Sequence, residues 1–416
     1  MIARFVASLL CCAALLAGCN TAMKGVSSLR SGNYAEAVAE FQAQVAANPA
    51  DWKAREMLGY AYLKGGDAQK AIPEFEKTLA LEPKASMCHV YLGWAQLKLD
   101  NQAAALEAWR AFNDPAKPLV KQEVDRLITL VEIEQSKKLA RQALAAEAQR
   151  SVVATRDNSY AIFNFAVSGV GADMVPLQKA LTAMTISDLA QIKGISVIER
   201  TRMQALLDEM RLGASGAVDP ATAPKAGRLL GAEKLVVGSM SDNAGTLGLA
   251  SSVASTKQSE LVGSFGLSEE KSRFFDLQKQ MLARIVEVNK IALDPEQGRT
   301  LLSHYHTRSY EATVSYGLGL DSLDKQDWLA AQGHFAKAAT LDPFFMLARI
   351  ARDHVPVGIT IRVGQQSSAD AVGERIEAAA VAQGISPTSS EAHIVTPGSL
   401  PGTTAPPIVR PPKHSW

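Results

Sequence analysis

The chain has few aromatic residues, only four cysteines and almost no net charge. Aromatic residues make up 6% of its 416 residues, and the formal net charge is +1. A nearly neutral chain lacks the basic footprint that marks nucleic-acid-binding domains. Beyond residue 19 there is no apolar run of 18 residues, so no spanning helix is predicted there. The length exceeds that of one ordinary core and indicates two or three domains.

The few cysteines are placed so that no internal disulfide is expected. Cys11 and Cys12 lie within the apolar stretch 5–16, Cys19 follows that stretch, and Cys88 stands alone. The stretch is too short to cross a bilayer but suits the apolar core of a secretory signal. Free cysteine is among the most buried residue types, so we expect Cys88 to be a buried small hydrophobe rather than a reactive thiol.

The segment Leu16-Ala17-Gly18-Cys19 resembles the lipobox of bacterial lipoproteins. The resemblance implies a signal peptide over residues 1–18, cleavage before Cys19, and lipid on that cysteine. Stable anchoring takes more than one acyl chain, which such a modification supplies. Asn20 stands where an aspartate would favour retention in the inner membrane. We therefore expect a lipid anchor at the periplasmic face of the outer membrane.

A period of 34 residues runs through the N-terminal part of the chain. It relates Gly25, Gly59 and Gly93; Asn33, Asp67 and Asn101; Ala37, Ala71 and Ala105; and Phe41, Phe75 and Trp109. The pattern resembles the tetratricopeptide repeat and predicts three repeats over 19–116. In each repeat the glycine and alanine let two helices approach, the Asn or Asp caps the second helix, and the aromatic residue fills the core.

Two further helical segments belong with these repeats. An amphipathic capping or connecting helix is predicted within 117–155, from the 4-3-4 spacing of Val120, Val124, Leu127 and Val131. The repeat pattern returns in a fourth hairpin, assigned to 297–352, at Gly319, Asp327, Ala331 and Phe335. A lone hairpin needs tertiary packing. We expect it to dock on the intervening domain or the long helix, giving Phe335, Leu341 and Phe344 a partner surface and partly burying Trp328.

First-helix residues line the concave face on which arrays of this kind bind peptides. In register, the candidate peptide-binding residues are Lys53, Glu56, Tyr60 and Lys64 from the second repeat, and Met87, Val90, Trp94 and Lys98 from the third. The alternative is that some of them are packing residues or solvated surface, because exposed aromatic residues near lysines are common without a binding role.

Between the third and fourth repeats the pattern changes to alternating strands and helices. Strands are expected at 160–167, 195–198 and 235–237, with weaker ones at 247–251 and 261–265, and helices at 175–192, 201–213, 219–231 and 273–289. Thr201 with Gln204 suggests a capping box, and Asp219-Pro220 a helix start. The fold class is therefore α+β multidomain: an α-helical tetratricopeptide solenoid plus an α/β sandwich domain with a mixed sheet.

Residues 158–290 resemble the periplasmic domain of the curli secretion-channel lipoprotein family, the CsgG-like family. The matching segments are Phe163-Asn164-Phe165, Val197-Ile198-Glu199-Arg200, Leu206-Leu207-Asp208-Glu209, Ser215-Gly216, Gly227 to Leu230, Gly231-Ala232-Glu233 and Val236-Val237-Gly238-Ser239. The resemblance implies an outer-membrane lipoprotein. The pore-forming member carries two long spliced membrane hairpins, whereas 242–266 has room for one short hairpin. A soluble binding or assembly module is therefore favoured over a pore.

No pattern for catalysis, a nucleotide or a metal is complete. Gly169-Val170-Gly171 lacks the further glycine and lysine of a phosphate loop. His304 and His306 lack additional ligands at zinc spacing and are interpreted as surface histidines. Glu199 and Arg200 are expected to form a structural pair or a protein contact. We expect no catalytic residue, metal or cofactor other than the covalent lipid on Cys19.

Together these features predict a non-enzymatic outer-membrane periplasmic lipoprotein, acting as an assembly scaffold or accessory in curli-like export or cell-surface structure biogenesis. Two alternatives stay open: a regulator of a peptidoglycan synthase, and a secretion pore subunit. The expected partners are periplasmic or outer-membrane proteins and the membrane through the lipid, with no nucleic acid; a homo-oligomer through the CsgG-like domain is a further option. Residues 353–384 are assigned to a small C-terminal segment, and the proline-rich 385–416 to a disordered tail.

Overall fold

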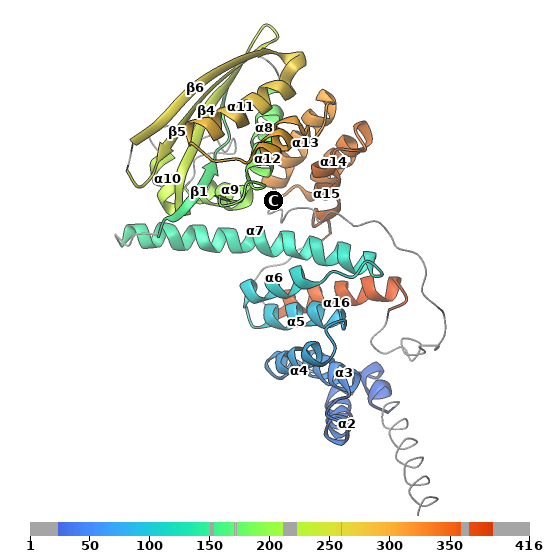
Figure 1. The fold of residues 1–416 in the computed structure, drawn as a ribbon. Helices are drawn as coiled ribbons and strands as arrows, with labels where there is room; N and C mark the ends of the chain where they lie inside the picture. The colour runs from blue at the N-terminus through green and yellow to red at the C-terminus, as the bar shows by residue number, and fades with distance from the viewer. Residues whose placement is uncertain are drawn as a thin grey trace, which may run out of the picture. The chain divides into compact units, whose positions relative to one another are not determined.

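A computed structural model describes residues 24–149, 154–169, 171, 173–210, 223–258, 260–358 and 366–385. The described chain forms two compact units: residues up to Val131 together with 366–385, and Glu132–Gly358. The division falls inside the helix α7 (Pro118–Ala148) (Figure 1). The predicted signal peptide and Cys19, the predicted helix start at Asp219-Pro220, and residues 386–416 lie outside the described residues.

The first unit contains the three predicted repeats as helix pairs. Residues 24–30 pair with α2 (Tyr34–Ala47), α3 (Trp52–Lys64) with α4 (Ala68–Leu81), and α5 (Met87–Lys98) with α6 (Gln102–Ala111). The first part of α7 follows, and Val120, Val124, Leu127 and Val131 are all buried, as the 4-3-4 spacing predicts. The unit also includes α16 (Gln366–Ala382), a helix from the far end of the chain.

The repeat glycines make room for the aromatic side chain of their own repeat. In each repeat a Cβ added to the glycine would lie within 3 Å of the repeat aromatic ring: 2.8 Å for Gly25 with Phe41, 2.8 Å for Gly59 with Phe75, and 2.2 Å for Gly93 with Trp109. The three rings are almost completely buried. A side chain at any of these glycines would therefore displace the aromatic core of its repeat.

The predicted helix caps are only partly present. The carboxylate of Asp67 accepts a hydrogen bond from the backbone N–H of Lys70 at the start of α4. Asn33 and Asn101 occupy the same position before α2 and α6, but neither side chain caps its helix. A carboxylate is the stronger acceptor because it carries the charge that an amide lacks. For Asn33 and Asn101 the prediction of a side-chain cap is wrong.

The second unit is built on one mixed sheet. Its strands are β1 (Arg156–Ile162), β2 (Ala166–Gly169), β3 (Ser196–Val197), β4 (Ala232–Asn243), β5 (Thr246–Ser255) and β6 (Glu260–Glu270). The order is β3-β1-β4-β5-β6, with β2 also paired to β4. The pairs among β1 to β4 are parallel, whereas β4 to β6 form an antiparallel meander. The predicted mixed sheet is therefore confirmed.

Helices cover both faces of this sheet. They are α8 (Met174–Leu189), α9 (Arg200–Glu209), α10 (Ala223–Leu230), the short η1 (Lys271–Arg273), α11 (Phe274–Val288) and α12 (Pro295–Ser303). Val288 of α11 lies against Gly263, on the face to which Val236 also belongs. Gly227 of α10 lies against Leu235, the neighbouring strand residue. Successive strand side chains alternate between faces, so α10 covers the opposite side from α11.

Several predicted elements differ from those observed. The segment 160–167 is two strands, β1 and β2, rather than one, and the weak strands near 247–251 and 261–265 are longer parts of the meander. Segment 242–266, expected to hold one short hairpin, belongs to this sheet. Thr201 lies within α9, whose N-cap is Glu199 without a side-chain bond, so the capping box is wrong. Instead, Gln204 donates to Asp208 at 2.8 Å.

The displaced fourth repeat is the hairpin of α13 (Tyr310–Asp324) and α14 (Trp328–Leu341), followed by α15 (Met346–His354). A Cβ on Gly319 would lie 2.4 Å from Phe335, as in the other repeats. Asp327 caps α14 by accepting from the N–H of Ala330. The local sequence therefore builds the same hairpin in a different surrounding.

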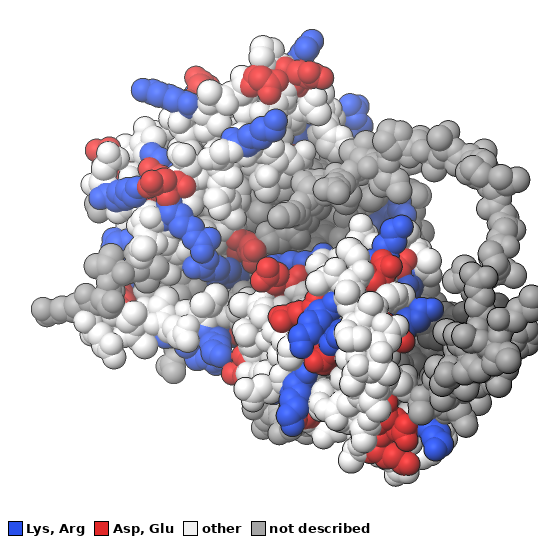
Figure 2. All heavy atoms as spheres, turned by 60° about the horizontal axis from the view of Figure 1, so that its bottom comes forward, with Lys and Arg blue, Asp and Glu red and all other residues white. Residues whose placement is uncertain are grey.

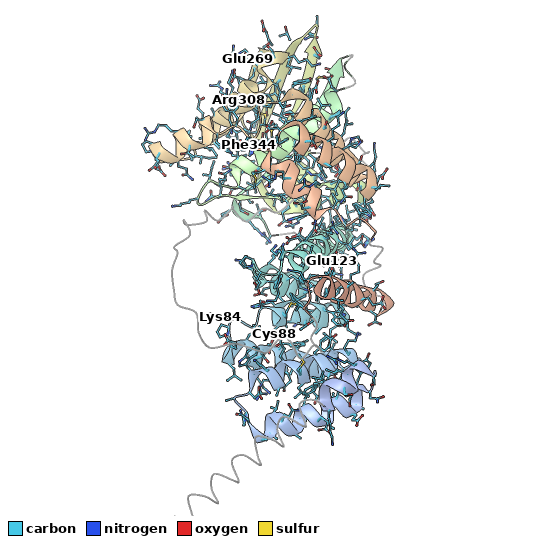
Figure 3. All side chains as sticks on the ribbon, turned by 90° about the vertical axis from the view of Figure 1, so that its right-hand side faces the viewer. Lys84, Cys88, Glu123, Glu269, Arg308 and Phe344 are labelled. Atoms are coloured by element: carbon cyan, nitrogen blue, oxygen red, sulfur yellow. The ribbon has the colours of Figure 1, made fainter. Side chains whose placement is uncertain are left out.

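This hairpin docks on the α/β domain, as predicted. A Cβ on Gly317 of α13 would lie 1.9 Å from the carbonyl oxygen of Pro176 in α8, so the two helix backbones touch. Trp328 is half-buried against the core. The predicted burial of Leu341 and Phe344 is wrong, because Phe344 is 87% exposed (Figure 3) and Phe345 takes the fully buried position instead.

Candidate protein-binding groove

The inner surface of the repeats is occupied by the helix α16. We call the surface formed by α3, α5 and the start of α7 the groove. In Figure 1, α16 (orange-red) lies alongside α5. The apolar side of α16 follows a 3-4-4 spacing and is buried, through Ala369, Val372, Ile376 and Ala380. This spacing places all four residues on one stripe of the helix, directed into the groove.

Trp94 of α5 forms the floor of the groove. A Cβ on Gly373 of α16 would lie 2.0 Å from Cζ2 of this ring, so only glycine allows the helix to approach this closely. The Trp94 indole Nε1–H donates to the carbonyl oxygen of Ala369 at 2.8 Å. The ring therefore contacts α16 through both its apolar surface and its single polar atom.

Basic residues of the second and third repeats pair with two acidic residues of α16. Lys64 Nζ lies 2.8 Å from Glu377 Oε1, and the Tyr60 hydroxyl donates to the same oxygen at 2.6 Å. Burial has the largest effect on the pKa of the Tyr60 hydroxyl and raises it, and the negative charge of Glu377 raises it further. Lys98 pairs with Asp370 at 2.5 Å. Lys64 and Lys98 hold equivalent positions one repeat apart.

The start of α7 forms the other wall. Arg375 of α16 binds Glu123 through two hydrogen bonds, of 2.5 and 3.2 Å, and Figure 3 labels Glu123 beside α16. Gln383 Oε1 accepts from the backbone N–H groups of Leu119 and Val120 at 3.0 and 3.1 Å. Gln383, directly after the end of α16, thus contacts an earlier part of α7 than Arg375 does, so the two helices run antiparallel here.

Four of the eight predicted groove residues contact α16, namely Tyr60, Lys64, Trp94 and Lys98. Met87 and Val90 are buried packing residues, and the Val90 carbonyl accepts from the Trp109 indole. The Lys53 ammonium lies over the neighbouring Trp52 ring, 5.5 Å from its centroid.

Glu56, the remaining candidate, faces Cys88 rather than α16. Burial raises the pKa of the Glu56 carboxyl, while a hydrogen bond with Cys88 opposes that rise. Burial and the neighbouring Glu56 raise the pKa of the Cys88 thiol. Cys88 is completely buried, so the prediction of a buried, packed cysteine is confirmed.

Sequence reasoning missed α16 itself. The segment 353–384 received no structural role, although a signal was present: a 3-4-4 apolar stripe with Asp370 and Glu377 seven residues apart, hence on one helix face. What could not be read from the sequence is that this helix returns to the first unit, 268 positions after α5 ends (366 − 98).

The second unit contains a buried cluster around Asp188 of α8. Lys279 and Gln278 donate to its Oδ2 at 2.8 Å each, and His306 Nε2 lies 2.9 Å from its Oδ1. Burial by itself would raise the pKa of Asp188, but His306 and Lys279 hold it below the usual range. The interpretation of His306 as a surface histidine is wrong, because the loop before α13 places its side chain over the buried carboxylate.

A second buried network joins α13 to the α/β domain. Lys179 of α8 lies 2.8 Å from both Asp321 and Asp324, and Arg200 lies 2.6 Å from Asp324. The Lys179 side chain is only 1% exposed and that of Asp324 7%. Arg200 therefore forms a structural ion pair, which is one of the two predicted alternatives. Its partner is Asp324 rather than Glu199.

Other features suited to chemistry are sparse in the described residues. A cavity of ≈ 260 Å³ lies between α7, α9 and α10, and Arg202 is the only charged residue among its described lining. Within the ranges described, no group of three His, Cys, Asp or Glu side chains could hold a metal ion. In the same ranges, no helix has both the length and the apolarity for a membrane crossing. On the face in Figure 2, acidic and basic side chains lie interspersed.

Two family models match segments of the chain, one in each unit. A tetratricopeptide-repeat model matches residues 23–86 and 56–118. A model described as curli production assembly/transport component CsgG matches residues 133–244, from the second part of α7 to the end of β4. The crystal structure of the yeast Tom70 shares 12% identity with a TM-score of 0.26, over 86% of this chain and 68% of that chain. No curated protein matches. The chain thus combines tetratricopeptide repeats with a CsgG-like domain.

Proposed function

We propose that this chain is a non-enzymatic lipoprotein scaffold, anchored to the outer membrane through lipid on Cys19, that holds partner proteins during curli-type assembly or export. The observation that carries the proposal is the groove, a surface shaped to hold a helix, on a chain that also contains a CsgG-like domain. A groove of this kind recognises partners by side-chain pockets and charge pairs rather than by chemistry on a substrate.

In this proposal each of the two units has its own task. The repeats supply the recognition surface, and the CsgG-like domain supplies the link to assembly components or to further copies of the chain. The lipid would confine both to the periplasmic face of the membrane, where secreted subunits pass. No cofactor is needed for this role, because holding a partner involves no bond breaking.

The anchor and the partners can be tested together. Cys19→Ala should abolish acyl labelling and release the protein from membranes on a carbonate wash, because the lipid is the only proposed anchor. Cys88→Ala, the matched control, should keep both labelling and membrane association. Affinity capture from detergent-solubilised membranes should then recover export or surface-assembly components with wild type.

Two results would contradict the proposal. Firm membrane association of the Cys19→Ala protein after removal of its signal would exclude the lipid as the anchor. Recovery of peptidoglycan synthases in place of export components would favour the regulator alternative.

A further inference from the structure

The α16 helix presents the groove with a defined pattern of side chains. Taking Gly373, which contacts Trp94, as the reference, an acidic residue lies three positions before it and another four positions after it. Apolar residues lie at −4, −1, +3 and +7, which are Ala369, Val372, Ile376 and Ala380. Each feature has a matching group in the groove: an indole face, two lysines and an apolar floor.

Two of the charge pairs that hold α16 lie close to solvent on at least one side. The Asp370 side chain is 52% exposed, and Lys64 and Glu377 are each about one quarter exposed. Pairs this close to solvent add little stability and are screened by salt. Two of the four residues of the apolar stripe of α16 are alanines, so the stripe buries less apolar area than that of a Leu- or Phe-rich helix.

We propose that the groove is a binding site for an amphipathic helix with a small residue against Trp94 and acidic residues at −3 and +4, and that α16 is its ligand in cis. A partner helix with the same pattern binds by displacing α16. This inference rests on the proposed function in that it names the class of partner and the regulation of that site. The tethered helix keeps the groove closed until a better-matched helix competes.

The test uses the full-length protein and a fluorescent peptide of residues 366–385 as the probe. In wild type the tethered α16 competes at a high effective concentration, so the peptide should bind weakly. Glu377→Lys places a cation against Lys64 and should release α16, raising peptide affinity at least about tenfold. Glu374→Lys makes the same charge change on the exposed side of α16 and should leave peptide affinity at the wild-type value.

Two further variants test the pattern itself. Lys64→Glu combined with Glu377→Lys restores an ion pair in cis and opposes Glu377 of the native peptide, so peptide binding should fall back to the wild-type value or below. Gly373→Ala should also open the groove, because its methyl group would overlap the Trp94 ring. A peptide carrying Gly373→Leu should not bind the opened groove.

The outcomes separate this inference from the proposed function. A folded Glu377→Lys protein that binds the peptide no better than wild type would overturn the inference. So would loss of the folded repeats in both the Glu377→Lys and Gly373→Ala proteins, since α16 would then be an integral part of the array. Peptide binding as expected, together with capture of the wrong class of partner from membranes, would leave the inference standing and refute the proposed function alone.

Discussion

The chain builds repeat hairpins in both units, and a different helix packs on the first helix of the hairpin in each: α16 on α5 and α8 on α13. In the first unit, α16 lies on α5 with Gly373 against Trp94. In the second, α8 lies on α13 with Gly317 against Pro176. Both contacts depend on a glycine that lets two helices touch, and both include lysine–carboxylate pairs. They differ in how well the best-buried pair is shielded: Lys179 and Asp324 are 1% and 7% exposed, whereas Lys98 and Asp370 are 7% and 52% exposed.

This difference in exposure supports the proposal that α16 leaves its contact with α5 more readily than α8 leaves α13. Lys179 and Asp324 are 1% and 7% exposed, so neither charge can be hydrated unless α8 and α13 separate. Removing one partner of a buried pair leaves an uncompensated charge, which is strongly destabilising. At α16, by contrast, Asp370 and Glu377 remain partly hydrated, and separation costs them little.

The largest expected effect comes from breaking one charge pair in each contact. Asp324→Asn leaves Lys179 and Arg200 buried with less negative charge, so it should lower the free energy of unfolding of the second unit by about 3 kcal/mol. Glu377→Gln, its counterpart on α16, should cost less than about 1 kcal/mol. Hydrogen exchange of the full-length protein, followed separately at α13 and α5, measures both. Equal losses of stability at the two sites would show that the two contacts are equally strong.

The next effect concerns the close helix approach. Gly317→Ala places a methyl group against the Pro176 backbone, which cannot rotate away as a side chain could, and should destabilise the second unit by about 1–3 kcal/mol. Gly333→Ala on α14 is the matched control, because nothing lies within 4 Å of its added Cβ. There the higher helix propensity of alanine should stabilise by up to about 1 kcal/mol. A neutral Gly317→Ala variant would show that α13 does not need α8 so close.

The smallest effect is a dependence on pH at the buried contact. Burial raises the pKa of Asp321, but Lys179 and Lys325 outweigh it and hold that pKa below its usual value. A carboxyl with a depressed pKa in the folded state contributes stability above its unfolded pKa of about 3.9, and loses it as the pH falls through the folded value. The second unit should therefore weaken below about pH 4, and Asp321→Asn should flatten that decline in acid-unfolding curves. An unchanged pH profile in this variant would assign the acid sensitivity to other carboxyls such as Asp188.

Much of the fold could be predicted because short-range patterns fix it. The 34-residue period located three hairpins and the displaced fourth, since a glycine and an aromatic ring 16 positions apart suffice to specify each pair. The mixed sheet was predictable from alternating strands and helices. The strands predicted for the meander of β4 to β6 are shorter than those observed, because Ser- and Gly-rich strands carry a weak strand signal.

Only one side of the groove contact could be predicted from the sequence, namely the residues on the repeats. Tyr60, Lys64, Trp94 and Lys98 follow from the repeat register, which places first-helix residues on the inner surface. The residues that face them, Asp370, Gly373 and Glu377, lie on α16. No local pattern in the sequence indicates which part of the fold this helix contacts. The same holds for His306, whose sequence neighbours give no indication of the buried Asp188 beneath it.

By itself, the sequence determined the repeat hairpins, the glycine–aromatic pairs within them and the alternation of the α/β domain. Each depends on spacing along the chain, because neighbouring helices and strands are set by local geometry. Only the tertiary structure decided which surface covers each hairpin: α16 on α5, and α8 on α13. Those contacts join residues more than 100 positions apart, and they form where shape and charge match in space.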